Sequence, residues 1–195
     1  VSGEALNHSG TATISSANAA SYTITNLAGI TIADGSGGTA SNYTLTGGTH
    51  NFTTNQRPLN ATLARQYDGT SNAAGSDLSS FDALQGGETL TLSGSGSAVN
   101  DNVANGISVS SLGTLALING TGLASNYSLN SAVINITQRV LSSSGSKAYD
   151  ANTNALAADI TLSNLVSGET LNHSGTASIS SANAASYTIT NLAGI

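Results

Sequence analysis

The chain has 195 residues, a net charge of −6 and 7% charged residues, against about 25% in an ordinary soluble protein. Its four cations argue against nucleic-acid binding and against docking on anionic lipid, and its lack of cysteine excludes disulfides and thiolate metal sites. No apolar run approaches the ~20 residues of a membrane helix, so we expect no membrane span.

Short runs in which apolar and polar residues alternate predict strands along the whole chain. In chain order, the apolar positions are Tyr22/Ile24, Tyr43/Leu45, Leu90/Leu92, Ile107/Val109, Leu115/Leu117, Tyr127/Leu129, Ile134/Ile136, Ile160/Leu162 and Tyr187/Ile189. Turns are predicted between these runs at Asp34-Gly35, Asp68-Gly69, Asn105-Gly106 and Asn119-Gly120. Residues 76–85 have the spacing for one helical turn, whereas the corresponding residues 158–167 are more typical of a strand.

Comparison of the chain with itself gives its organisation. Residues 1–30 recur at 166–195 with two differences, Ala5/Thr170 and Thr13/Ser178. The stretch that begins at Arg57 also resembles the one that begins at Arg139. We therefore expect the C-terminal part of a repeat unit at 1–56, a complete unit at 57–138, and the N-terminal part of the next unit at 139–195.

A unit of this size with one apolar and one polar strand face predicts an all-β fold, either a β-sandwich or a β-grasp-like unit with mostly antiparallel strands. A β-solenoid is the alternative for a chain rich in Gly, Asn, Ser and Thr. Solenoid coils repeat about every 20–30 residues, and no such short period is present.

Three strings of the complete unit carry a family resemblance: ARQYDGTSNA from position 64, GGETLTLSG from 86 and ASNYSLN from 124. Together they resemble the YDG/MBG repeat domains of filamentous-haemagglutinin-like bacterial surface adhesins. The resemblance implies a secreted, non-enzymatic module at the bacterial cell surface. Ala151 departs from the pattern, because the family has Gly after Tyr-Asp.

The recurring motif residues are expected to be structural, with Tyr covering the edge of the core and Asp starting a turn. They are Tyr67, Asp68, Gly69, Tyr149, Asp150, Tyr43 and Tyr127. A ligand-binding Tyr-Asp pair is the alternative.

The remaining candidates for chemistry are isolated, so we expect no catalytic, cofactor or metal site. A calcium loop at Asp34 has a single carboxylate where several are needed, and no glutamate or histidine has a partner at a useful spacing. These residues are Glu4, Glu88, Glu169, His8, His50 and His173. We expect solvated carboxylates and histidines at the surface or rim.

Three roles follow from these patterns. The first is a stalk or fibre that provides reach, with neighbouring units of the same or identical chains as partners. The second is direct binding of polysaccharide or a host surface, and the third is self-assembly by strand addition between chains. Eight Asn-x-Ser/Thr sequons are about as many as chance predicts, so glycosylation stays a hypothesis.

Overall fold

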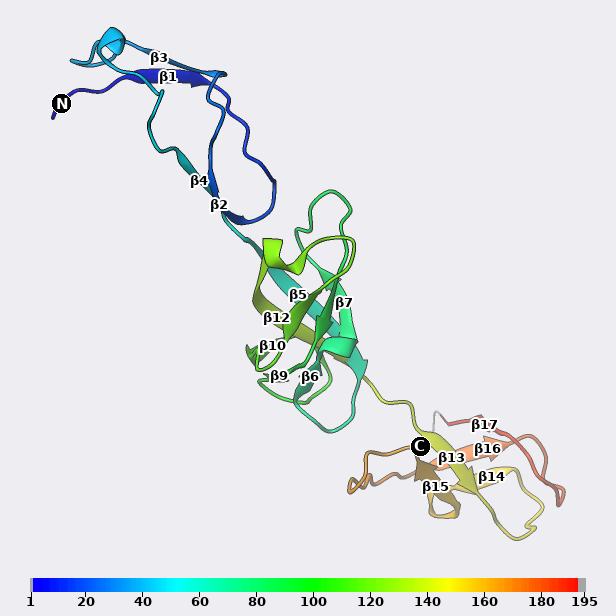
Figure 1. The fold of residues 1–195 in the computed structure, drawn as a ribbon. Coiled ribbons are helices and arrows are strands. Elements are labelled where there is room, and N and C mark those ends of the chain that lie inside the picture. The colour runs from blue at the N-terminus through cyan, green and yellow to red at the C-terminus, as the bar shows by residue number, and fades with distance from the viewer. Residues whose placement is uncertain (1, 193–195) are drawn as a thin grey trace.

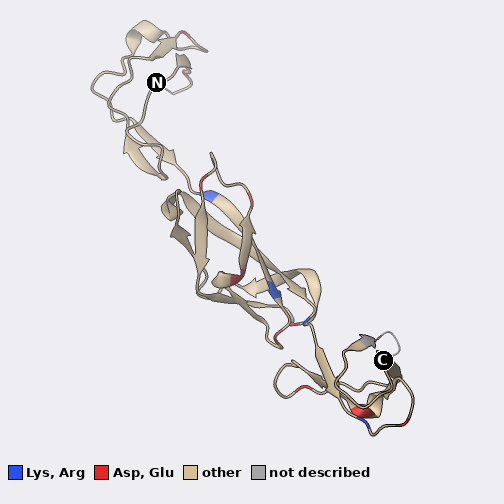
Figure 2. Cartoon of the chain, turned by 90° about the vertical axis from the view of Figure 1, so that its right-hand side faces the viewer, with Lys and Arg blue, Asp and Glu red and all other residues tan. Residues whose placement is uncertain are grey.

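The computed structural model describes residues 2–192 and arranges them as three bodies in a row (Figure 1). Residues 57–137 form the central body, and the segments before and after it lie at its opposite ends in both views (Figures 1 and 2). Among the described residues, no helix has the length and apolar character needed to cross a bilayer.

Strands dominate all three bodies, and within the described residues the helical elements are single turns of 3-10 helix. The strands are β1 Asn7–Gly10, β2 Ala20–Thr23, β3 Ile30–Ala33, β4 Asn51–Thr54, β5 Arg57–Gln66, β6 Asn72–Ala74, β7 Leu78–Phe81, β8 Leu90–Ser93, β9 Ser95–Ala98, β10 Ala104–Ser111, β11 Ala116–Asn119, β12 Tyr127–Thr137, β13 Ser142–Gly145, β14 Asn154–Leu156, β15 Ile160–Ser163, β16 Thr176–Ile179 and β17 Ile189–Asn191. The 3-10 turns are η1 Ala40–Asn42, η2 Gly75–Asp77, η3 Ala124–Asn126 and η4 Ala157–Asp159.

The central body is built on a six-stranded sheet in the order β6-β9-β10-β12-β5-β7. The first and last strands, β5 and β12, lie side by side and run parallel, from Tyr127 opposite Arg57 to Thr137 opposite Gln66. The other neighbours in this sheet are antiparallel, and a separate pair, β8 with β11, packs against it. The chain therefore enters the central body at one end and leaves it at the other.

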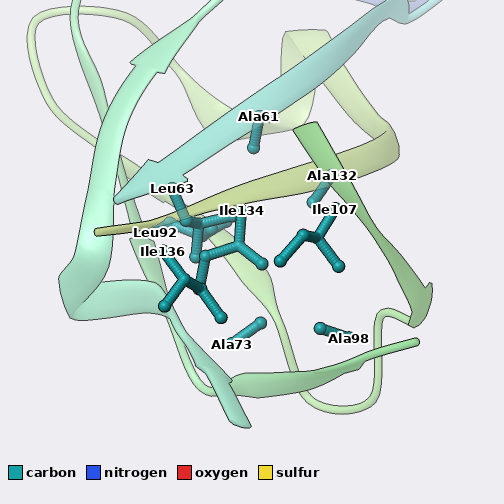
Figure 3. Packing of buried hydrophobic residues seen from close by; sticks show 9 residues of the cluster. All are labelled: Ala61, Leu63, Ala73, Leu92, Ala98, Ile107, Ala132, Ile134 and Ile136. Atoms are coloured by element: carbon teal, nitrogen blue, oxygen red, sulfur yellow. The ribbon is translucent and has the colours of Figure 1, made fainter. Parts of the chain in front are cut away.

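The core follows from the alternation of residues along β5 and β12. Leu63 and Ile134 face each other in the parallel pair, and both are 0% exposed. Burying an aliphatic side chain of this size contributes about 1.5–3 kcal/mol. Figure 3 shows the nine buried members of this cluster: Ala61, Leu63, Ala73, Leu92, Ala98, Ile107, Ala132, Ile134 and Ile136.

The segment before the central body pairs its strands as the second half of that body does, except that β10 has one extra residue between Ala104 and Ile107 that β2 lacks. The pair β1–β3 corresponds to β8–β11, and the pair β2–β4 corresponds to β10–β12. His8 lies opposite Ile32 in the first segment, as Leu92 lies opposite Leu117 in the central body. Likewise, Tyr22 lies opposite Phe52 as Ile107 lies opposite Ile134.

The segment after the central body has the registers of the first half. The pair β13–β15 corresponds to β5–β7, and β14–β16–β17 corresponds to β6–β9–β10. A register shift between Thr62 and Leu63 in the β5–β7 pair gives the centre one extra residue, and β13–β15 pairs without such a shift. Gly145 lies opposite Ile160 in this segment, as Leu63 lies opposite Leu78 in the central body. Likewise, Asn154 lies opposite Ser178 as Asn72 lies opposite Ser97.

The prediction of an all-β protein with mainly antiparallel strands is confirmed, but three local predictions differ from the structure. Asn105-Gly106 was predicted to be a turn; it lies inside β10, at an irregularity where Gly106 has φ +68°. The run at 43–46 forms no strand, since no described strand pairs with it as β5 pairs with β12. Residues 76–85 were predicted to have the spacing of one helical turn; in the structure they contain only the end of η2, followed by β7.

Candidate functional site: the tyrosine-acid contacts and the joints

The Tyr67-Asp68-Gly69 motif forms a turn at the end of β5 that hydrogen bonds and an ion pair stabilise. The Asp68 carboxylate accepts hydrogen bonds from the Thr70 amide at 3.0 Å and the Thr70 hydroxyl at 2.9 Å, and it pairs with the Arg65 guanidinium. Gly69 provides the left-handed conformation that this turn needs, with φ +75°. Partial burial raises the pKa of Asp68, but the Thr70 hydrogen bonds and Arg65 outweigh this and leave the pKa below its ordinary value.

The second copy of the motif builds the same turn with different residues. Lys147 donates to Asp150 at 2.9 Å, and the Asn152 amide donates to the same carboxylate at 3.1 Å. The hydrogen bond from Lys147 lowers the pKa of Asp150. Ala151 takes the left-handed conformation of Gly69, with φ +58°, although its side chain makes this conformation less favourable.

Two motif tyrosines hold glutamates that we expected to be solvated. The Tyr127 hydroxyl donates to Glu88 and accepts from the Gln85 amide at 3.2 Å, and Tyr43 donates to Glu4 in the same way. The hydrogen bond to Glu88 raises the pKa of Tyr127. Glu4 is exposed as expected and Glu88 is half-buried, and each carboxylate also accepts a hydrogen bond from a tyrosine. Sequence reasoning missed these pairs, although each Glu precedes its Tyr by 39 positions and this repeated spacing could have revealed them.

The other two residues of the first motif, Tyr67 and Gly69, lie at the joint with the following segment. The Tyr67 hydroxyl donates to Glu169 across 102 positions of the chain, which raises the pKa of Tyr67. A Cβ added at Gly69 would lie 2.8 Å from Val166 Cγ1, so this position is also closely packed. The Arg139 side chain donates to the Asn164 carbonyl at 2.6 Å, fixing the start of the following segment. In contrast, Tyr149 is 67% exposed.

The joint with the preceding segment is made by side-chain amides. The Asn126 side chain accepts from the Ala19 amide at 2.9 Å and donates to Asn18 Oδ1 at 3.0 Å. Gln56 donates to the Ser125 carbonyl at 3.1 Å. Both joints therefore use motif residues: Asn126 of the ASNY string at one end and Tyr67 at the other.

Among the remaining candidates, Asp34, His50 and His173 contact backbone groups. Asp34 accepts from the Ala40 amide at 2.7 Å, and Asn119 accepts from the Ala124 amide at the same distance, so both hold the turn that follows them. His173 Nε2 lies 3.0 Å from the Ala157 carbonyl. Within residues 2–192, no three His, Asp or Glu side chains are grouped to hold a metal ion. Figure 2 shows that charged residues are few and scattered over all three bodies.

These contacts define the central body as a small all-β domain whose recurring Tyr, Asp and Asn residues hold turns and joints. Comparison with known families agrees: residues 55–135 match the YDG domain, and the chain contains a YDG domain at this position. Neither the curated proteins nor the solved structures gave a match.

Proposed function

We propose that the chain is a structural repeat region of a large secreted bacterial surface adhesin, where it forms part of a stalk or fibre and has no catalytic activity. The observation that carries this proposal is the parallel pairing of β5 with β12. Because the first and last strands of the domain run in the same direction, successive domains extend along one line. The extracellular, cell-surface location rests on the resemblance to adhesin repeats and on the YDG match.

The expected gain in length follows from the strand geometry. The paired register covers ten positions of β5, from Arg57 to Gln66, and a strand rises about 3.3 Å per residue. One unit therefore adds about 33 Å, and a few residues of linker bring this to roughly 35–40 Å.

The repeats and joints also support a role in reach. Two stretches of nearly identical sequence, 1–30 and 166–195, suit a task in which the number of units is more important than any single site. The joint contacts of Asn126 and Tyr67 use recurring motif residues, so the same contacts can form at successive joints.

The test measures length against the number of units. Since 166–195 repeats 1–30, a second copy of 31–195 joined after Ile195 continues the pattern without a seam. The added 165 residues are two units of about 82 and should increase the maximum dimension in small-angle scattering by about 70–80 Å. A dimension that stays nearly constant, with a globular scattering profile, would refute the proposal.

Direct binding of polysaccharide or a host surface is the second candidate, and the exposure of Tyr149 favours it. This ring is 67% exposed, and aromatic rings with one polar end suit sugar recognition. Glycan-array binding by the full chain that is lost in Tyr149→Ser would support this role. Equal binding by both proteins, or none by either, would contradict it.

A further inference from the structure

The pair Asn119-Gly120 ends β11 of the complete central domain and begins the turn that leads to η3. In such a pair the backbone nitrogen of the glycine can attack the side-chain amide of the asparagine, because no Cβ hinders its approach. Asn119, Gly120 and Thr121 are all exposed, so water reaches the amide and ammonia can leave. The pair is therefore a candidate for spontaneous deamidation.

The Asn119 side chain is held in a way that favours this attack. Its Oδ1 accepts a hydrogen bond from the Ala124 amide at 2.7 Å. A donor at this oxygen stabilises the negative charge that develops there when a nucleophile adds to Cγ, as the donors of an oxyanion hole do. Among the described residues outside the strand ladders, the Gly120 amide donates to no backbone carbonyl, so its nitrogen has no such partner to leave before it attacks.

A second Asn-Gly pair in the same domain is held differently. Asn105 and Gly106 lie inside β10 and are also exposed, so water reaches both pairs. The Gly106 amide donates to Asn135 Oδ1 at 2.7 Å. This hydrogen bond must break before the nitrogen can attack, which adds to the barrier. The two pairs have the same two residues and differ in their hydrogen bonds, so each is a control for the other.

The preceding segment shows that this kind of turn accepts the product. By strand register, Asp34 follows β3 at the position that Asn119 has at the end of β11. Its carboxylate accepts from the Ala40 amide at 2.7 Å, the same distance as the contact of Asn119 with Ala124. An aspartate at position 119 can therefore keep the hydrogen bond that holds the turn.

We propose that Asn119 is a modification site at which the folded chain converts asparagine to aspartate without an enzyme. The Gly120 nitrogen bonds to Asn119 Cγ, and the bond from Cγ to the side-chain nitrogen breaks. The proton of the Gly120 amide passes through water to the departing nitrogen, which leaves as ammonia. Water then opens the cyclic imide: addition at Cγ gives aspartate, and addition at the main-chain carbonyl gives isoaspartate. The conversion adds one negative charge to the net charge of −6.

The first test follows both pairs in the unmodified sequence. The folded chain is kept at mildly alkaline pH, and peptide mass spectrometry measures conversion at Asn119 and Asn105. Asn119 should convert about 3- to 10-fold faster, which is the factor that one hydrogen bond at Gly106 is worth. In urea these contacts are lost, so the two rates should approach each other. Equal rates in the folded chain, or the same difference in urea, would overturn the proposal.

Ala124→Pro removes the N–H group that activates Asn119. Leu123 has φ −90° and ψ 121°, the extended conformation that a residue before proline takes. Ala124 is the first residue of η3, a position that suits proline. The variant should slow conversion at Asn119 and leave the rate at Asn105 unchanged in the same molecule. An unchanged or faster rate at Asn119 would contradict the role of this contact.

Asn135→Ala is the reciprocal variant. It frees the Gly106 amide and should speed conversion at Asn105, whereas the rate at Asn119 should stay the same. If Asn105 converted no faster in this variant, the explanation of the difference between the two pairs would be wrong.

Two substitutions at position 119 test whether the turn accepts the product. Asn119→Asp keeps an acceptor for the Ala124 amide and should melt close to the unmodified chain at neutral pH. Asn119→Ala loses the acceptor and should melt several degrees lower. If Asn119→Asp melted as low as Asn119→Ala, the turn would not accept the carboxylate and the proposal would fail. None of these outcomes bears on the length test, so the inference is independent of the role as a stalk.

Discussion

The parallel pair β5–β12 makes Ile134 the most informative position for a stability measurement. Its side chain is 0% exposed and lies between Leu63 on β5 and Ile107 on β10. Ile134→Ala removes buried carbons and leaves a cavity, which costs about 2–5 kcal/mol. A domain of this size has a total stability of about 4–12 kcal/mol, so the variant is expected to fold only marginally.

Hydrogen exchange of peptides covering β5 and β12 reports this domain separately from the outer segments. A loss of 2–5 kcal/mol should speed exchange of these amides about 30-fold to several thousand-fold. Ile134→Val removes one carbon and should cost only about 0.5–1.5 kcal/mol. Ile118→Ala is the control, because Ile118 is 45% exposed and its loss should change stability by about 0.5 kcal/mol or less.

The order of these three effects decides the question. If Ile118→Ala costs as much as Ile134→Ala, or if Ile134→Ala leaves exchange in β5 unchanged, then Ile134 does not join β12 to β5 in a shared core. The physical argument for the order of the strands in the sheet would then be refuted.

Three further predictions concern the turns and contacts. Tyr127→Phe removes the hydroxyl that binds Glu88 and should lower the free energy of unfolding by about 1 kcal/mol, as measured by urea denaturation. Because the pKa of Tyr127 is raised in the fold, its contribution is complete below the unfolded pKa of about 10 and is lost as pH rises through the higher folded value; phenolate absorbance checks this. Because the pKa of Asp68 is lowered in the fold, its contribution to stability is present above the unfolded pKa of about 3.9 and is lost as pH falls through the folded value. Asp68→Asn should therefore flatten this part of the acid-unfolding curve, and an unchanged curve would contradict the prediction. Gly94→Ala should lower the melting temperature far more than Gly86→Ala. Both glycines have positive φ, but only at Gly94 would the new Cβ lie 2.1 Å from the Thr114 carbonyl oxygen. Equal melting temperatures of the two variants would contradict this.

Periodicity predicted most of the short strands because their apolar residues face the core. The alternation at Leu90/Leu92 and Ile134/Ile136 became β8 and part of β12, with these four side chains buried. The parallel union of β5 with β12 could not be predicted in this way. Alternation shows which face of a strand is buried, but it does not show which strand lies next to it.

The same limit explains the local differences. Asn105-Gly106 has the composition of a hairpin turn, yet its glycine serves an irregularity within β10, and both structures use a positive φ. The roles of Glu4 and Glu88 depend on tyrosines 39 positions away, which the local sequence does not reveal. The Tyr67 contact with Glu169 joins two different bodies and lies further beyond the reach of local patterns.

The direction of β5 and β12 also determines how the central domain bears tension. A pull on the two ends of the domain draws β5 and β12 along their axes in opposite directions. The hydrogen bonds at their ten paired positions therefore bear the load at the same time. If the terminal strands were antiparallel, both chain ends would lie at the same end of the strand pair, and a pull would break the hydrogen bonds one after another from that end. A domain anchored at one end and loaded at the other, for example by flowing liquid, therefore meets the force with its longest ladder of hydrogen bonds in shear.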